Sequence, residues 1–392
     1  SVIYESPKLR KEVLRLEKEI DLLSTKLEIQ TMLATRDYLD AVSNTLFLKI
    51  GQAMRQISNA AGDIANLHIS IEGQPIPQIF QLIISLSDES INRIKVDSQS
   101  WDGLTKNNIQ EIEELFGIDL MAINRKNKWI VEISPYKDRL KIDDRVICRG
   151  SISALNVLRK AAKGKLSKKE EMINELETLS TPNTKIGLDI DASEQHLVRT
   201  ISYLKKKSEL ALDLAFSALL LNDSRLADEV IRLETELDNL DRTLGNIALN
   251  IHSRSLEQQD TILNLIKLSK ALEEISDAAA LIISPLRTNE DTGIPPILKE
   301  IVQSTEEKIS IYEVDEDSEA KGSSVGEFEN QVHGMWIVAI FRPDRGYIID
   351  PPESFVIDMN DTLIFKAYGK TKKRLKLYEE KDTEINDFGL NV

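Results

Sequence analysis

The sequence predicts an α+β protein made of two repeats, each an antiparallel bundle of long helices followed by a small βαβββα module. Three observations lead to this prediction: long segments with apolar residues spaced three and four apart, short segments that alternate apolar and polar residues, and the occurrence of the whole pattern twice. At 392 residues the chain is long enough for roughly two to four domains.

The repeat is visible residue by residue. Leu9–Leu23 matches Leu226–Leu240 at an offset of 217, and Ile57–Ala61 matches Ile275–Ala279 at an offset of 218. The charged residues of the first copy that recur are Glu12, Arg15, Glu17, Glu19 and Asp21. Further along, the residues Ala122, Ile123, Arg125, Trp129 and Asp144 match Ala339, Ile340, Arg342, Tyr347 and Asp361. A similarity that stays in register this long indicates a duplicated unit.

The two units differ at their beginning. Ser1 aligns with Ala218, in the middle of the second unit, so the first unit has no counterpart of the helix expected over Glu194–Leu221. We expect that this helix either lies outside the sequence or is supplied by a partner.

The helical half of each unit follows from its apolar spacing. In the second unit, Asn222–Ser224 is a short polar turn between the helices expected over Glu194–Leu221 and Arg225–Ser253, and a short loop makes neighbouring helices antiparallel. The stripe of the second helix consists of Leu226, Val230, Leu233, Leu237, Leu240, Leu244, Ile247 and Ile251. Its counterpart in the first unit is Leu9, Val13, Leu16, Ile20, Leu23 and Leu27, and a third helix carries Leu265, Leu268, Leu272, Ile275, Ala279 and Ile282.

Short connecting helices come next. Pro77 and Pro295 precede amphipathic segments near Ile79–Leu86 and Ile297–Ser304. A further helix is expected over Lys168–Leu179, inside the connection between the two units.

The α+β half of each unit is predicted from alternating strands around two helices. Its first copy is expected to contain strands at Ile91–Val96, Ile118–Asn124, Lys128–Ile133 and Arg145–Arg149, and helices at Asn108–Phe116 and Ser151–Ala162. Arg125–Asn127 is the predicted hairpin turn. The second copy runs from Ile309 to Lys381, with its hairpin turn at Pro343–Gly346.

These segments predict six parts of the chain. They are a helical bundle lacking its first helix (1–88), an α+β module (89–163), a linker (164–192), a complete helical bundle (193–306), a second α+β module (307–382) and a tail (383–392).

Composition excludes several classes of protein. A net charge of −15 argues against nucleic acid as the main partner. No segment approaches the ~20 apolar residues of a membrane span, and no signal peptide is recognisable. The single cysteine, Cys148, is expected to be a buried thiol. We therefore expect a cytoplasmic protein that does not itself span a membrane.

Catalytic motifs are missing as well. The four histidines, His68, His196, His252 and His333, are scattered singly, and the sequence contains no nucleophile elbow, zinc-binding helix or P-loop. The sequence therefore predicts a protein that is not an enzyme.

Two sets of residues carry a family resemblance. Glu229–Asp238 and Leu272–Ala279 resemble the PhoU helical domain of phosphate-uptake regulators. The later half of the unit resembles the TrkA C-terminal (RCK-C) domain of potassium-transport regulators, through Val338–Arg342, Tyr347–Asp350, Pro351–Pro352 and Asn360–Asp361. The Rossmann half of that family is absent, since no Gly-x-Gly-x-x-Gly follows a strand.

The resemblance implies a regulatory or accessory protein of cation transport, with potassium as the expected cation. A membrane cation transporter or channel subunit would be its partner, at the inner face of the membrane, and a homo-oligomer is compatible with this role. Paired RCK-C domains form a cleft that in some family members binds a small ligand such as a cyclic dinucleotide. We therefore predict that the two modules face each other about a pseudo-two-fold axis, with a ligand site at Ile123, Arg125, Ile340 and Arg342.

A divalent metal is the second candidate ligand. Glu234 and Asp238 lie four residues apart on one helix, and Glu273 and Asp277 lie four apart on another, so each pair shares a face. Carboxylate oxygens suit a hard cation, and the PhoU family uses such pairs for metal clusters. The alternative is that Arg242 and Lys270 neutralise these carboxylates in ordinary salt bridges. The first unit keeps one pair, Glu17 and Asp21, but has Arg55 and Asn59 in place of the other, so metal is expected only in the second bundle.

Two other functions are compatible with the sequence. One is a phosphate-signalling adaptor of the PhoU type that binds divalent metal. The other is a structural scaffold, which would show no change on adding a ligand.

Overall fold

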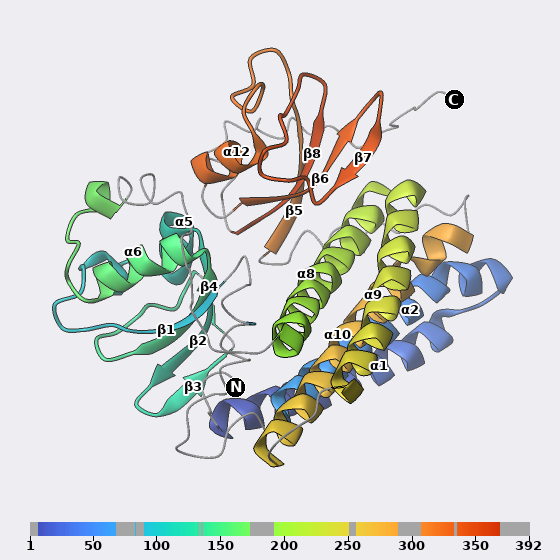
Figure 1. The fold of residues 1–392 in the computed structure, drawn as a ribbon, viewed down its shortest axis with the longest axis horizontal. Helices are drawn as coiled ribbons and strands as arrows, with labels where there is room; N and C mark the ends of the chain where they lie inside the picture. The colour runs from blue at the N-terminus through green and yellow to red at the C-terminus, as the bar shows by residue number, and fades with distance from the viewer. Residues whose placement is uncertain are drawn as a thin grey trace.

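Long helices and two small antiparallel sheets make up the fold (Figure 1). The computed structural model describes residues 7–67, 83, 90–131, 133–134, 136–172, 192–250, 256–288, 307–332 and 335–368. This mixture of elements confirms the predicted α+β class. In these ranges, no helix is long and apolar enough to cross a membrane.

The long helices pack into one bundle. They are α1 (Pro7–Ala34), α2 (Tyr38–Ala65), α8 (Ala192–Leu221), α9 (Ser224–Asn250) and α10 (Leu256–Thr288). Helix α1 packs on α2, α9 packs on α10, and α8 packs on both α9 and α10. The two halves join where α2 packs against α10. Small residues such as Ala53, Ala278 and Ala279 are fully buried in the shared core, which allows close approach of the helices.

The predicted stripes account for these contacts. Val230, Leu233 and Leu237 of α9 are at most 1% exposed. The turn before α9 also forms as predicted, because the Asp223 carboxylate accepts a hydrogen bond from the backbone N–H of Arg225 at 2.9 Å.

The first sheet belongs to the first α+β module. In chain order the module contains β1 (Ser90–Lys95), α4 (Gly103–Lys106), α5 (Ile109–Phe116), β2 (Ile118–Arg125), β3 (Lys128–Ile130), β4 (Arg145–Gly150) and α6 (Ile152–Ala162). Its antiparallel strands follow the spatial order β1-β4-β2-β3. Strand β3 ends at Ile130, three residues earlier than predicted.

The second sheet has the equivalent strand order, β5-β8-β6-β7. Its module contains β5 (Glu307–Glu313), α12 (Val325–Gln331), β6 (Met335–Arg342), β7 (Gly346–Ile349) and β8 (Thr362–Tyr368). Both sheets have a register shift at matching positions, between Leu120 and Ala122 and between Ile337 and Ala339. Capping boxes begin α5 and α12, with Glu111 and Glu327 as the N3 residues.

Each sheet packs one face under the helices of its own module. In the first module this core includes Phe116, Ile123 and the fully buried Cys148, whose thiol pKa is raised by burial. In the second module it includes Phe328 and Ile340.

The opposite face of each sheet packs on a long helix. Leu9 at the start of α1 contacts Ala122 and Ile147 of the first sheet. Leu226 at the start of α9 belongs to the cluster that contains the matching Ala339 and Ile364 of the second sheet. Each sheet thus contacts its own module on one face and a long helix of the bundle on the other.

The two modules do not pair as predicted. Within the described residues no apolar cluster joins them, and Figure 1 shows the first sheet beside the bundle and the second above the upper ends of α8 and α9. In the described part of the chain, the apolar residues of each module therefore pack within that module or against the bundle, and the predicted cleft is not formed.

Several predicted features lie outside the described residues. These are most of the two short helices near Ile79–Leu86 and Ile297–Ser304, the end of the helix predicted over Lys168–Leu179, the last helix of the second module, and His68, His252 and His333. His196 is exposed on α8.

Candidate metal centre

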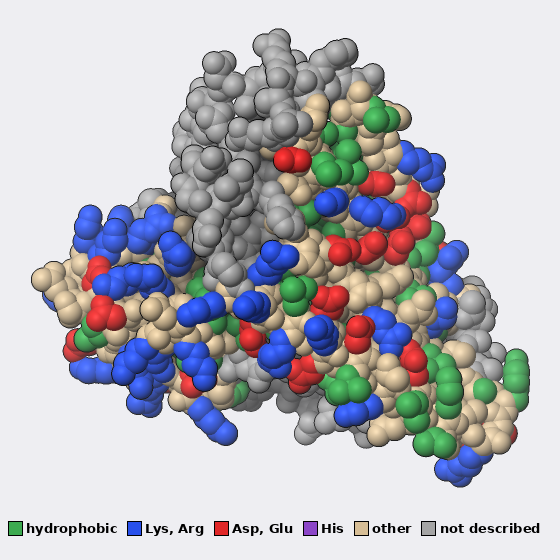
Figure 2. Space-filling model, turned by 90° about the horizontal axis from the view of Figure 1, so that it is seen from below, with side chains coloured by type: hydrophobic (Ala, Val, Ile, Leu, Met, Phe, Trp, Pro, Cys, Tyr) green, Lys and Arg blue, Asp and Glu red, His purple; other side chains and the backbone are tan. Residues whose placement is uncertain are grey.

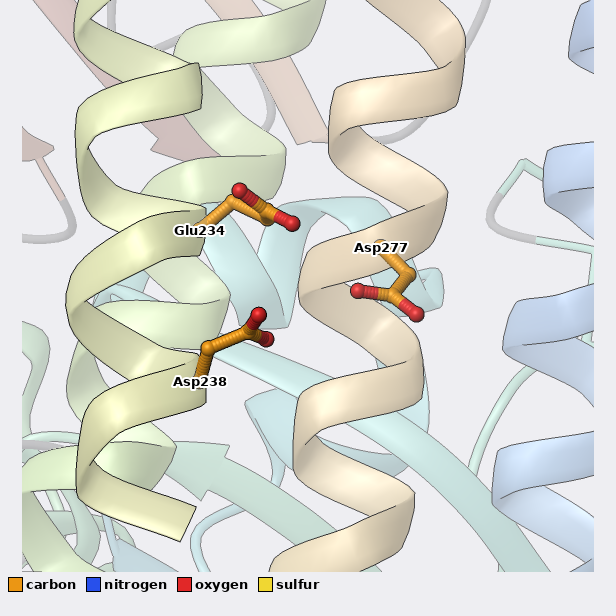
Figure 3. Close-up of side chains that lie close together, drawn as sticks. All are labelled: Glu234, Asp238 and Asp277. Atoms are coloured by element: carbon orange, nitrogen blue, oxygen red, sulfur yellow. The ribbon is translucent and has the colours of Figure 1, made fainter. Parts of the chain in front are cut away.

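Three carboxylates meet between α9 and α10. Glu234 and Asp238 lie one turn apart on α9, and Asp277 extends toward them from α10 (Figure 3). Each offers a ligand oxygen, and these oxygens all lie within 4.8 Å of one another. The side chains are half-buried, so water and ions can reach them.

The fourth predicted ligand, Glu273, is turned to another partner. Its carboxylate accepts a hydrogen bond from the Lys270 ammonium. Arg242 lies 3.9 Å from Asp238 and is mostly exposed, which makes it a weak, solvent-screened partner. Both salt bridges considered from the sequence are therefore present, but they lie at the edges of the cluster.

The cluster holds more negative charge than its neighbours neutralise. Burial, followed by the charges of Glu273, Asp238 and Glu234, raises the pKa of Asp277 to about 6. The pKa of Glu234 is raised by burial and by Asp238. Like charges held together in this way are relieved either by a proton or by a cation. Oxygen ligands without sulfur or imidazole favour Mg²⁺, Ca²⁺ or Mn²⁺.

The first half carries a positive charge at the corresponding place. Arg55 of α2 stands where α10 has Glu273, and its Nε lies 3.5 Å from the Asp21 carboxylate of α1. A second nitrogen of Arg55 lies 3.2 Å from Glu28 and also donates to the Thr25 hydroxyl at 3.2 Å. In the first half a guanidinium group therefore neutralises Asp21, the counterpart of Asp238.

The four residues of the predicted ligand site do not come together. Ile123 and Ile340 are buried in the cores of separate modules. Arg125 donates two parallel hydrogen bonds to Asp144, at 2.9 and 2.6 Å. Arg342 does the same to Asp361, at 2.7 and 2.6 Å.

Both aspartates in these pairs are buried, with side chains only 2% and 0% exposed. The two arginines therefore join the β2–β3 and β6–β7 hairpins to the neighbouring strand. Ligand binding at these positions stays a prediction.

A polar junction between the second sheet and α9 escaped the sequence reasoning. The Tyr347 hydroxyl donates to Asp223 at 2.7 Å, and the Arg225 guanidinium lies over the rings of Phe341 and Tyr347, 5.0 and 5.3 Å from their centroids. The repeat contained a signal for it, because Lys8 occupies the position of Arg225 and donates to the Asn127 carbonyl in the first hairpin, at 3.0 Å.

Comparison with known proteins identifies the helical part. Residues 201–284 match the PhoU domain, and this range contains all four predicted metal ligands. The match covers α10 and α9 almost completely and most of α8. No curated protein matches the chain.

Solved structures give only a faint likeness. The chain is similar to a GsuK channel bound to NAD (12% identity, TM-score 0.18), to a GsuK channel (11%, 0.18) and to the GsuK RCK domain (13%, 0.17). Each alignment covers 86% of this chain, and 65%, 65% and 78% of the respective relative. The chain thus spans less than two thirds of the length of the first two. TM-scores this low do not define a common fold.

Proposed function

We propose that this protein is a non-enzymatic regulator linked to ion transport, whose second helical half binds a divalent cation through Glu234, Asp238 and Asp277. The observation that carries the proposal is the convergence of three carboxylates within 4.8 Å, from two helices of the segment that matches the PhoU domain. The first half supports it by contrast, since Arg55 neutralises the corresponding place there.

A bound cation would act by joining two helices. Burial and the neighbouring carboxylates raise the pKa of Asp277; a bound cation would offset both effects by attraction and hold α9 to α10. Helix α9 begins at the junction with the second sheet, and Arg225 precedes Glu234 by about 14 Å along the helix axis at 1.5 Å per residue. A change in the position of α9 on cation binding would therefore be transmitted to the second sheet through a single rigid helix.

The transport partner in this proposal is a membrane cation transporter or channel subunit, with potassium as the transported ion and the cytoplasm as the location. This part rests on the resemblance of the two modules to RCK-C domains. Within the described residues the two modules share no apolar cluster, so sensing of a small ligand, such as a cyclic dinucleotide, would require modules of two chains to pair through surfaces that the bundle does not contact. A phosphate-signalling adaptor with the same metal centre is the alternative, and a response of phosphate uptake but not of potassium uptake would favour it.

The test is a titration with Mn²⁺. We expect calorimetry to detect one Mn²⁺ per chain and the melting temperature to rise as Mn²⁺ is added, because an ion that binds only the folded state stabilises it by mass action. The Asp238→Asn, Asp277→Asn double variant should lose both responses, whereas Asp228→Asn on the exposed face of α9 should keep them. Equal Mn²⁺ binding by the double variant would refute the metal centre.

A further inference from the structure

The first half of the bundle lacks a helix that the second half has. In the second half, α8 packs on both α9 and α10. Helices α1 and α2 are the counterparts of α9 and α10 in sequence register and in mutual packing, yet within the described residues no helix takes the place of α8 beside them.

The burial of matching residues shows the consequence. Val230, Leu233 and Leu237 of α9 are 0%, 1% and 0% exposed. Their counterparts on α1, Val13, Leu16 and Ile20, are only partly buried. The next residue of the stripe, Leu23, is 56% exposed, whereas its counterpart Leu240 is partly buried.

The same difference appears on the second helix of each pair. Ala279 of α10 is fully buried, and its counterpart on α2, Ala61, is exposed. The exposed apolar surface therefore continues from α1 onto α2, along the line that α8 covers in the other half. Figure 2, seen from below, shows hydrophobic side chains gathered at the outer end of this helix pair, where Ile29, Met32, Leu33 and Tyr38 are more than half exposed.

Polar groups that anchor α8 have counterparts as well. The Tyr203 hydroxyl of α8 donates to Glu236 at 2.7 Å, and Glu236 also lies 3.8 Å from Arg232. In the first half Glu19 occupies the position of Glu236 and pairs with Arg15 at 2.7 Å. Each helix pair thus presents a carboxylate beside its apolar stripe.

A second anchor comes from the sheets. Lys366 of the second sheet lies 3.1 Å from Asp213 of α8. Arg149 stands at the same position of the first sheet, on the face that meets α1, where it already lies 3.4 Å from Asp119. A helix with the charge pattern of α8 would bring an acidic side chain to it.

We propose that the surface formed by α1 and α2 is a docking site for an amphipathic helix with the chemistry of α8. That helix carries small or apolar residues along one face, a tyrosine that reaches Glu19 and an acidic residue that reaches Arg149. In α8 the face consists of Ile201, Leu204, Ser208, Ala211, Ala215 and Ala218, all 0% exposed. This proposal is independent of the metal centre.

The experiment uses a synthetic peptide with the sequence of residues 192–221, added to the full chain, and a scrambled peptide as its control. We expect the α8 peptide to bind and to raise the melting temperature, and the scrambled peptide to do neither. Leu23→Lys should weaken binding by more than about tenfold, because it places a charge in the apolar stripe. Glu19→Gln should weaken it by a smaller factor, through loss of a charge-assisted hydrogen bond.

Leu22→Lys is the matched control. Leu22 is 55% exposed, nearly the same as Leu23, but its counterpart Asn239 lies exposed, outside the contact with α8. We expect this variant to bind the peptide as the wild type does.

Three results would overturn the proposal. The first is that the α8 peptide does not bind. The second is that Leu22→Lys weakens binding as much as Leu23→Lys, which would place the peptide elsewhere. The third is a wild-type dimer in sedimentation that Leu23→Lys converts to a monomer, since a second copy would then occupy the surface.

Discussion

The two halves of the protein share the residues that hold their sheets together and differ in the charges between their helices. Arg125–Asp144 and Arg342–Asp361 are matching buried pairs with nearly identical distances. Between the helices, by contrast, Asp21 meets the guanidinium of Arg55, whereas Asp277 meets two further carboxylates.

This contrast separates two kinds of constraint. A buried carboxylate that loses its partner is strongly destabilising, so both copies need the pair for the module to fold. A half-exposed cluster between helices tolerates the replacement of a negative side chain by a positive one. One half can then carry the charges that a cation site needs while the other does not. The comparison predicts that substitutions at the two shared pairs lower stability equally. It also predicts that exchanging the charges between the helices changes metal binding in opposite directions in the two halves.

The largest effect is expected at the shared pairs. Asp144→Ala and Asp361→Ala should each destabilise their module by about 3 kcal/mol, because each leaves a partly buried arginine without its carboxylate. Urea unfolding monitored by circular dichroism measures this. Asp102→Ala, which removes an exposed pair with Lys106, should cost less than about 0.5 kcal/mol. A large effect at one aspartate and none at the other would show that the two modules are not stabilised alike.

The next effect is an exchange of metal binding between the halves. Glu273→Arg combined with Asp277→Asn gives the second half the charges of the first, and Mn²⁺ affinity should fall about 30-fold, which is about 2 kcal/mol. Arg55→Glu combined with Asn59→Asp makes the reverse change and should raise the metal content from one ion per chain to two. Metal analysis after dialysis measures both. An unchanged metal content in both variants would contradict the role of Arg55.

A smaller effect concerns the pH dependence of stability in the second module. Burial raises the pKa of Glu329 to about 7, while the Ile337 N–H that it accepts at 2.7 Å acts in the opposite direction. The folded state keeps a proton that the unfolded chain loses above its ordinary value of 4.5. Stability should therefore fall as pH rises from about 4.5 to about 7, by roughly 1–2 kcal/mol.

Glu329→Gln should reduce this pH dependence and raise the melting temperature at pH 8. Glu316→Gln, at an exposed position of the same module, should change neither. Melting curves between pH 5 and pH 8 measure the difference between variant and wild type. The same slope in Glu329→Gln as in the wild type would assign the pH dependence to other groups.

The smallest effect is expected at surface pairs that both halves share. Arg15 pairs with Glu12 and Arg232 with Glu229, each at 2.7 Å, and both arginines are about half exposed. Arg15→Ala and Arg232→Ala should each change stability by less than about 0.5 kcal/mol, since solvent screens such pairs. A loss above 1 kcal/mol in thermal unfolding would show that these pairs contribute to the bundle core.

Apolar periodicity is a local property of the chain, so the sequence was sufficient to predict the class of fold, the positions of the long helices and the strand segments. The stripe from Leu226 to Leu244 located α9, and alternation located β2 and β6. The register of the repeat also aligns the two Arg–Asp pairs, Arg125–Asp144 and Arg342–Asp361, but it does not indicate that the arginine and the aspartate of each pair are in contact.

The contacts between side chains of different elements, by contrast, could not be predicted from the sequence. Spacing places Glu234 and Asp238 on one face of α9, and Glu273 and Asp277 on one face of α10. In the structure Glu234, Asp238 and Asp277 converge, whereas Glu273 pairs with Lys270. Spacing likewise does not indicate that the first sheet contacts α1 and the second sheet contacts α9, in place of the predicted contact between the two modules. These contacts join residues far apart in the chain. They depend on how helices and sheets pack against one another and on the rotamers this packing allows, and neither leaves a periodic signal in the sequence.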